Sequence, residues 1–270
     1  MDIKFLEEKA REIRISTLDM VLKAGSGHLG GSYSCADILV ALYYSVMRKD
    51  SESDRDRFVL SKGHANPALY AILIDKGYLP IEAKDTLRQY GSPLQGHPDS
   101  AKCPGLDCST GSLGQGISVA TGMALGLKKA SSDKRVFVVT GDGEIEEGIC
   151  WEAFMAAAQF KLDNLTVIID RNGLQLSGPT AEIMDIENLK AKMEAFGFDV
   201  EEIDGHSFDS LIPALEKRCE GKPRCVIAKT VKGKGVSYME NAVNWHGAAP
   251  NDELYAVAIE ELTTALAAFN

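Results

Sequence analysis

Three consecutive stretches near the middle of the chain predict a strand, a helix and a second strand. Residues 136–140 are a short run of β-branched and aromatic residues, typical of a strand buried on both faces. Residues 148–161 place apolar side chains at helical spacing, and residues 165–169 form a second apolar run of strand length. A strand, a helix and a strand in so few residues predict a βαβ unit, in which the two strands are parallel.

Further periodic segments extend this pattern along most of the chain. Apolar residues at helical spacing predict helices, and short apolar runs predict strands. The predicted helices cover residues 3–24, 35–47, 65–74, 80–90, 116–130, 187–196, 208–219 and 252–269, and further strands cover residues 58–60, 199–203 and 224–229. The sequence therefore predicts one domain over residues 1–270, of the α/β class, with a doubly wound, mostly parallel sheet and helices on both faces.

Three glycine-bearing segments interrupt the predicted elements. Residues 25–32, 91–110 and 230–250 lack periodicity and are rich in glycine, with several prolines in the second. Long irregular loops inside a compact domain are usually functional, so we expect them to contribute to a site.

The composition argues against several classes of protein. Hydrophobic residues make up 45% of the 270 residues and charged residues 25%, which are ordinary values for a globular protein. The net charge of -10 argues against a nucleic acid or an anionic membrane as the main partner. The apolar runs are far shorter than a membrane span, and the charged N-terminal segment is no signal peptide, so we expect a cytoplasmic protein. The six cysteines do not have the spacing of a complete zinc site.

Asp142 and Asn172 are the candidate metal ligands. Each follows a strand of the predicted βαβ unit, so both lie at the carboxyl edge of the sheet, where open α/β sheets bind ligands. A carboxylate and an amide oxygen are hard donors suited to Mg²⁺ or Ca²⁺, and Mg²⁺ fills its other positions with phosphate oxygens and water. The tripeptide Gly141-Asp142-Gly143 alone is typical of a turn. With a strand before it, a helix after it and Asn172 ending the next strand, we expect a diphosphate held through a divalent cation.

All five histidines lie beside a glycine. His206, at the predicted start of a helix, is expected to have a structural role. The other four are spread over irregular loops and are His28, His64, His97 and His246. Imidazole groups donate and accept hydrogen bonds and protons at neutral pH, as a carbohydrate-processing site requires.

Seven motifs of the chain occur in the order found in one known family. They are SKGHA, GHPDS, STGSLGQG, GDG with Asn172 after it, IDGH, KTVKGKG and NWHGAAP. The GDG and Asn172 pair resembles the thiamine diphosphate motif, and the full set resembles the N-terminal, diphosphate-binding half of transketolase. Leu29, Ser32 and Ser112 stand where many full-length transketolases have proline, which leaves the substrate open.

The resemblance implies a role for each matching residue. Metal ligands would be Asp142, Asn172 and, through its carbonyl, Leu174; cofactor contacts would be His64, Gly111, Ser112, Leu113, Gly143, Asn172 and His246. Groups that line the sugar channel or connect two active sites would be His28, His97, His246, Glu147 and Glu152. Without the resemblance, the two glutamates are typical of an exposed acidic helix start.

The resemblance also implies an activity and a partner. A full transketolase chain is more than twice as long, and its second half binds the pyrimidine ring of the cofactor. We therefore expect an N-terminal subunit that works with a separate C-terminal subunit, as an α2β2 assembly, and transfers a two-carbon ketol unit from a ketose to an aldose. Alternatives are a subunit of a deoxyxylulose-phosphate synthase-like or 2-oxoacid dehydrogenase-like enzyme, and a non-catalytic regulatory subunit. A truncated transketolase would have the same sequence.

Overall fold

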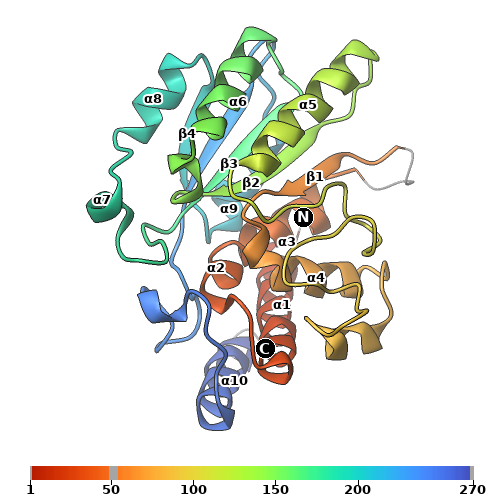
Figure 1. Cartoon of the computed structure of the whole chain (residues 1–270), viewed down its shortest axis with the longest axis vertical. Coiled ribbons are helices and arrows are strands. Elements are labelled where there is room, and N and C mark those ends of the chain that lie inside the picture. The colour runs from red at the N-terminus through yellow and green to blue at the C-terminus, as the bar shows by residue number, and fades with distance from the viewer. Residues whose placement is uncertain (1, 49–53, 268–270) are drawn as a thin grey trace.

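The computed structural model describes residues 2–48 and 54–267, and its centre is a five-stranded sheet (Figure 1). The strands are β1 (Arg57–Leu60), β2 (Val136–Gly141), β3 (Leu165–Arg171), β4 (Asp199–Asp204) and β5 (Arg224–Lys229). They lie in the order β1-β2-β3-β5-β4, and every neighbouring pair is parallel. The predicted α/β class with a parallel sheet is confirmed, and the strand at residues 224–229 has the predicted ends.

Both faces of the sheet are buried, because its side chains alternate between two apolar clusters. On β2, Phe137 and Val139 belong to one cluster, while Val136 and Val138 belong to the other. The first cluster packs against α1 (Ile3–Ala24), α3 (Ala36–Ala41), α4 (Asn66–Asp75), α9 (Phe208–Glu216) and α10 (Asp252–Ala267). The second packs against α5 (Gln115–Lys129), α6 (Gly148–Gln159) and α8 (Leu189–Ala195), which lie together on the upper side of Figure 1. Polar side chains are thus confined mainly to the ends of the central strands.

Short helical segments complete the chain. They are α2 (Leu29–Ser34), the π-helical turn η1 (Leu42–Val46), α7 (Thr180–Ile183), and the 3-10 turns η2 (Gly63–Ala65), η3 (Ile81–Thr86), η4 (Glu144–Glu146) and η5 (Val243–Trp245). None of the helices over residues 2–48 and 54–267 combines the length and the apolar character that crossing a membrane would require.

The predicted helices differ from the observed ones mainly at loops and ends. α1 has the predicted bounds, with Asp2 as its N-cap and Gly25 as its C-cap. The predicted loop at residues 25–32 is partly wrong, because residues 29–34 form α2, whose six residues are all buried. A six-residue helix rich in glycine is not stable alone, so the surrounding packing stabilises it.

The predicted helices at residues 35–47 and 80–90 are also partly wrong. The first consists of α3 followed by the π-helical turn η1. The second is only the 3-10 turn η3, and the chain turns away at Arg88, whose φ is 60°. The expected end of the last helix, residues 268–269, lies outside the described residues.

Replacing Gly233 by alanine should destabilise the protein far more than replacing Gly25. Both glycines have positive φ, 77° and 61°. A Cβ at Gly233 would lie 2.3 Å from the backbone oxygen of Met239, whereas a Cβ at Gly25 meets nothing within 4 Å. We expect a loss of about 1 kcal/mol for Gly25→Ala from the backbone conformation alone, and about 3 kcal/mol or more for Gly233→Ala. Urea denaturation measures both, and equal losses would contradict the steric argument.

Candidate functional site

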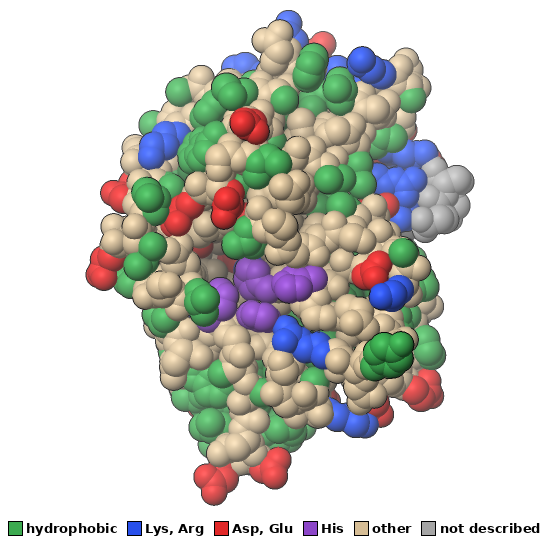
Figure 2. Space-filling model, in the orientation of Figure 1, with side chains coloured by type: hydrophobic (Ala, Val, Ile, Leu, Met, Phe, Trp, Pro, Cys, Tyr) green, Lys and Arg blue, Asp and Glu red, His purple; other side chains and the backbone are tan. Residues whose placement is uncertain are grey.

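A cavity of about 260 Å³ lies at the carboxyl edge of the sheet, among the loops that follow β1, β2, β3 and β5. Its wall includes Lys62, His64, Asp142, Asn172, Lys232 and His246. The histidine side chains gather in the middle of the face shown in Figure 2. Parallel sheets bind their ligands at this edge, so the cavity is the candidate site.

Asp142 and Asn172 line the same cavity, as the sequence predicts. The Asp142 carboxylate accepts the N–H of Gly143 (2.9 Å) and the N–H of Gly173 (2.6 Å), so it joins the loops after β2 and β3. The Asn172 Oδ1 accepts the N–H of Leu174 at 3.1 Å. Burial, the largest cause, raises the pKa of Asp142 to about 6, although the N–H groups of Gly173 and Gly143 and the charge of Lys62 act in the opposite direction.

The oxygen donors around Asp142 fit a divalent cation whose remaining positions are filled by a bound phosphate group and water. No three His, Cys, Asp or Glu side chains come together as a metal site anywhere in residues 2–48 and 54–267. A cation beside Asp142 could take one carboxylate oxygen from Asp142 and the amide oxygen of Asn172, and Leu174 also lines this cavity. Mg²⁺ is typically bound in this way, with its other positions filled by phosphate oxygens and water.

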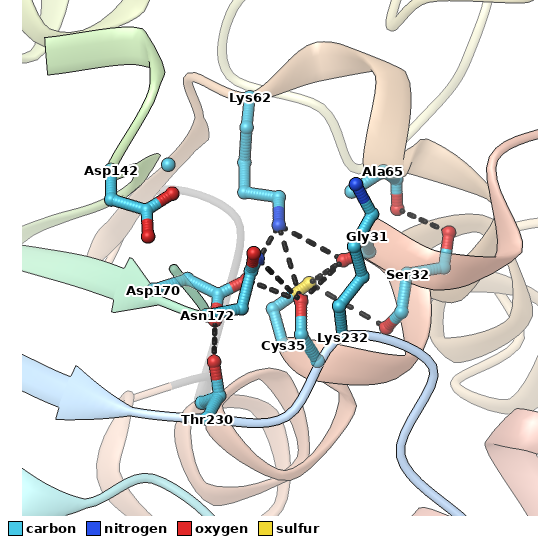
Figure 3. A network of polar contacts seen from close by, with 12 residues as sticks. Gly31, Ser32, Cys35, Lys62, Ala65, Asp142, Asp170, Asn172, Thr230 and Lys232 are labelled. Carbon is cyan, nitrogen blue, oxygen red and sulfur yellow. Dashed lines mark hydrogen bonds and ion pairs between the residues drawn. The ribbon is translucent and has the colours of Figure 1, made fainter. Parts of the chain in front are cut away.

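Lys62 lies beside the cavity in a buried polar network (Figure 3). Its Nζ donates to Asp170 (2.5 Å) and to the backbone oxygen of Gly31 (3.0 Å). Asp170 also accepts the hydroxyl groups of Ser34 and Thr230. Burial alone would lower the pKa of Lys62, but the charge of Asp170 raises it above its usual value, so the lysine is a permanent cation.

Lys232 provides a second cation at the cavity but has a different environment. Its Nζ lies 3.0 Å from His246 Nδ1 and 3.5 Å from the backbone oxygen of Gln175. Burial first, and then the charge of Lys62, lower the pKa of Lys232 to about 8. Within residues 2–48 and 54–267 no carboxylate forms an ion pair with Lys232, so an anion that entered the cavity would supply a counter-charge, which fits a diphosphate.

Glu144 is a buried carboxylate that connects three loops around the cavity. Its Oε1 accepts the Ser61 hydroxyl (2.5 Å) and the N–H of Gly114 (2.9 Å), and its Oε2 accepts the N–H of Gly141 (3.0 Å). Ser61 follows β1, Gly114 precedes α5, and Gly141 ends β2. Glu144 therefore holds together the segments that form the cavity on this side.

Three of the histidines form a cluster at the cavity. The ring centroids of His28, His64 and His246 lie 5.2–5.6 Å from one another. Burial first, and nearby cations second, lower the pKa of His28 and of His246 to about 4 and hold that of His64 well below its usual value. All three rings are therefore neutral near pH 7 and act as hydrogen-bonding groups.

His97 does not line the cavity itself but packs beside the turn that contains Gly111. A Cβ on Gly111 would lie 3.2 Å from the His97 ring. Leu113 lines the cavity, whereas Ser112 is exposed. The segment of residues 111–113 thus lies between His97 and the cavity.

The other predicted residues lie away from the cavity. Glu147 and Glu152, at the start of α6 and one turn further along it, are exposed. His206 is held by Asp37, 2.6 Å from its Nδ1, and by the N–H of Val231, which donates to its Nε2 (2.8 Å). These contacts agree with the structural role expected for His206.

Sequence reasoning missed Lys62, Lys232, Glu144 and Asp170. Lys62 and Lys232 belong to the motifs SKGHA and KTVKGKG, so their position beside glycines was a signal for an anion site. Glu144 and Asp170 had no comparable signal, because their partners come from segments up to 136 residues away.

Comparison with known proteins identifies the sequence family. The domain described as "Transketolase, thiamine diphosphate binding domain" matches residues 6–266. An apulose-4-phosphate transketolase subunit from Phocaeicola vulgatus is 44% identical, over 97% of this chain and 95% of that protein. A 6-deoxy-6-sulfo-D-fructose transketolase subunit from a Clostridium species is also 44% identical, over 95% of this chain and 96% of that protein.

A solved structure has the same fold. The transketolase of Campylobacter jejuni superimposes with a TM-score of 0.91 at 35% identity. The superposition covers 97% of this chain but only 43% of the Campylobacter chain. This chain therefore matches the two transketolase subunits over nearly their whole length, and the Campylobacter transketolase over less than half of its length.

Replacing Glu144 by glutamine should destabilise the segments around the cavity. The glutamine amide would point a donor at one of the three groups that now donate to Glu144, and a buried unsatisfied donor costs about 1–3 kcal/mol. The free energy of unfolding, measured with urea, should fall by that amount. The exposed Glu152→Gln is the matched control and should change stability by less than about 0.5 kcal/mol. Equal effects of the two substitutions would show that Glu144 does not connect the loops.

Proposed function

Because the chain belongs to the transketolase family, we propose that it is the N-terminal, diphosphate-binding subunit of a two-chain transketolase. It transfers a two-carbon ketol unit from a ketose to an aldose together with a separate C-terminal subunit. Its cofactor is thiamine diphosphate, held with Mg²⁺ or Ca²⁺. The expected location is the cytoplasm.

One observation carries this proposal. Asp142, Asn172 and two lysines surround a single cavity at the carboxyl edge of a parallel sheet. The carboxylate and the amide oxygen suit a hard divalent cation, and the two lysines suit the diphosphate that shares it. The names of the relatives favour a transketolase over the dehydrogenase and synthase alternatives, since both are subunits of transketolases.

The residues of this chain bind and orient the cofactor. Asp142, Asn172 and the Leu174 carbonyl hold the cation. Further contacts to the diphosphate and the cofactor come from Lys62, Lys232, His64, Gly143, His246 and the segment Gly111, Ser112 and Leu113. When bound, thiamine diphosphate supplies the carbon centre that carries the two-carbon unit.

The remaining residues contact the sugar or the partner. His28, His97 and His246 form hydrogen bonds with sugar oxygens, and the neutral state of His28 and His246 suits them to this role. Glu147 and Glu152 are exposed on α6 and connect two active sites across the subunit interface of an α2β2 assembly. The partner supplies the pyrimidine-binding half of the site.

Overall sequence identity does not indicate which ketose is the substrate. Two relatives with the same 44% identity carry different sugars in their names, a phosphorylated one and a sulfonated one. An assay should therefore offer ketoses of both kinds, with several aldoses as acceptors.

Reconstitution tests the proposed division into two chains. The chain mixed with a C-terminal transketolase subunit should catalyse ketol transfer that requires thiamine diphosphate and Mg²⁺, because each chain supplies half of the site. Removing the cation with EDTA should abolish the activity, and adding Mg²⁺ or Ca²⁺ should restore it. Product formation is followed by chromatography. Activity of this chain alone would refute the two-chain proposal.

Replacing Asp142 by asparagine should weaken Mg²⁺ binding by about tenfold or more, since the proposed cation site loses its carboxylate ligand. Calorimetric titration of the cation in the presence of the cofactor measures the affinity. Asp209→Asn, an exposed substitution on α9, is the control and should leave the affinity unchanged. The free energy of unfolding of Asp142→Asn, measured without the cation, shows whether the substitution also lowers stability. Unchanged affinity in Asp142→Asn would exclude Asp142 as a ligand.

A further inference from the structure

Arg88 lies in a strained backbone conformation next to the histidine cluster. Its φ of 60° is in the left-handed region, which few residues other than glycine occupy. The backbone is fixed there by a hydrogen bond from the Arg88 N–H to the oxygen of Leu94 (2.7 Å). Strained residues of this kind persist where the surrounding structure requires them, often at functional sites.

The side chain of Arg88 is aimed at His28. One terminal nitrogen donates to the Ser26 hydroxyl at 2.6 Å, and the other lies 3.0 Å from His28 Nδ1. The Arg88 Nε is buried and has no hydrogen-bond partner within the described part of the chain. No carboxylate in residues 2–48 and 54–267 forms an ion pair with Arg88. The guanidinium is therefore kept partly buried without an ion-pair partner among the described residues, and its hydrogen-bond partners are the Ser26 hydroxyl and the imidazole of His28.

A guanidinium only donates hydrogen bonds, whereas imidazole nitrogen either donates or accepts. His28 Nδ1 must therefore accept from Arg88, and the proton of the neutral ring must be on Nε2. We infer that Arg88 is a positioning residue that fixes this tautomer, so that His28 presents Nε2–H as a hydrogen-bond donor on the side of the histidine cluster. That side also contains Gly247, where a Cβ would lie 3.5 Å from His28 Nε2.

The chain contains an internal contrast to this arrangement. His206 Nε2 accepts the N–H of Val231, and its Nδ1 faces the Asp37 carboxylate, so the proton of a neutral His206 is on Nδ1. His246 resembles His28, since its Nδ1 faces the Lys232 ammonium at 3.0 Å. The histidines beside cations thus expose Nε2–H, and the histidine beside a carboxylate has the opposite tautomer.

The chemical consequence rests on the proposed function, although the tautomer itself does not. A histidine locked as an Nε2–H donor favours a sugar oxygen that is gaining negative charge, and it does not accept a hydroxyl proton at Nε2. Arg88 would then determine which oxygens of the ketose His28 recognises. Burial lowers the pKa of His28, and the positive charge of Arg88 acts in the same direction.

Long-range ¹H–¹⁵N spectra of the full chain, labelled with ¹⁵N-histidine, test the inference directly. The His28 signals are assigned by their loss in His28→Gln. We expect the Nε2–H pattern for His28 and the Nδ1–H pattern for His206 in the same spectrum. An Nδ1–H pattern for His28 would overturn the inference, and this result needs no variant of Arg88.

Variants then test whether Arg88 causes the tautomer. Arg88→Met should mix the two His28 tautomers and raise the pKa of His28, because a donor and a nearby positive charge are removed, and His206 should not change. Ser26→Ala is the matched control: it removes the other partner of Arg88 and should leave the His28 tautomer intact. An unchanged His28 spectrum in Arg88→Met would also overturn the inference.

Kinetics of the two-chain enzyme separate this inference from the proposed function. Arg88→Met should lower kcat about tenfold, the equivalent of one lost hydrogen bond, and leave cofactor affinity unchanged. Arg88→Lys, which keeps a cationic donor, should recover part of the loss. If the unsubstituted two-chain protein does not transfer ketol units, the proposed function is refuted. The His28 spectrum still shows which tautomer is present. Full activity in Arg88→Met would refute the role of the tautomer in catalysis.

Discussion

Lys62 and Asp170 form an ion pair beneath the cavity, and their side chains are 2% and 0% exposed. Removing two charges from water costs several kcal/mol, and the pair is stable only when further hydrogen bonds satisfy it. Ser34 and Thr230 supply these bonds to Asp170, and the Gly31 carbonyl accepts one from Lys62. The pair therefore connects the ends of β1, β3 and β5 with α2, and the cavity depends on this connection for its shape.

The same pair explains the charge of the site. The protein has a net charge of -10, yet its cavity is lined by Lys62 and Lys232 as well as by the carboxylates of Asp142 and Glu144. Lys62 is paired with Asp170, whereas Lys232 forms no ion pair with a carboxylate of the described residues, so more of the charge of Lys232 is left for a ligand. Lysines in such a cavity favour an anion even in an acidic protein, because the local charges act at short range and in a low dielectric.

The sequence predicted those features that depend on local patterns. The parallel strands, the long α1 and the position of Asp142 and Asn172 at one cavity follow from apolar runs and from the geometry of a βαβ unit. It failed at α2, where a glycine-rich composition indicates a loop but burial stabilises a helix. Glu144 and Asp170 escaped prediction because their role arises only when segments 30 to 136 residues apart meet. A carboxylate in a sequence gives no sign of which distant donors it will accept.

The left-handed backbone at Arg88 is unfavourable for an arginine, although the side chain of this residue makes specific contacts. Glycine would adopt the same φ at no steric cost, so the left-handed conformation by itself favours glycine over arginine by about 1 kcal/mol. It would, however, have no guanidinium to offer. The backbone conformation and the side-chain contacts of Arg88 therefore favour different residues at this position, so a substitution chosen for the backbone alone would remove the contacts with Ser26 and His28.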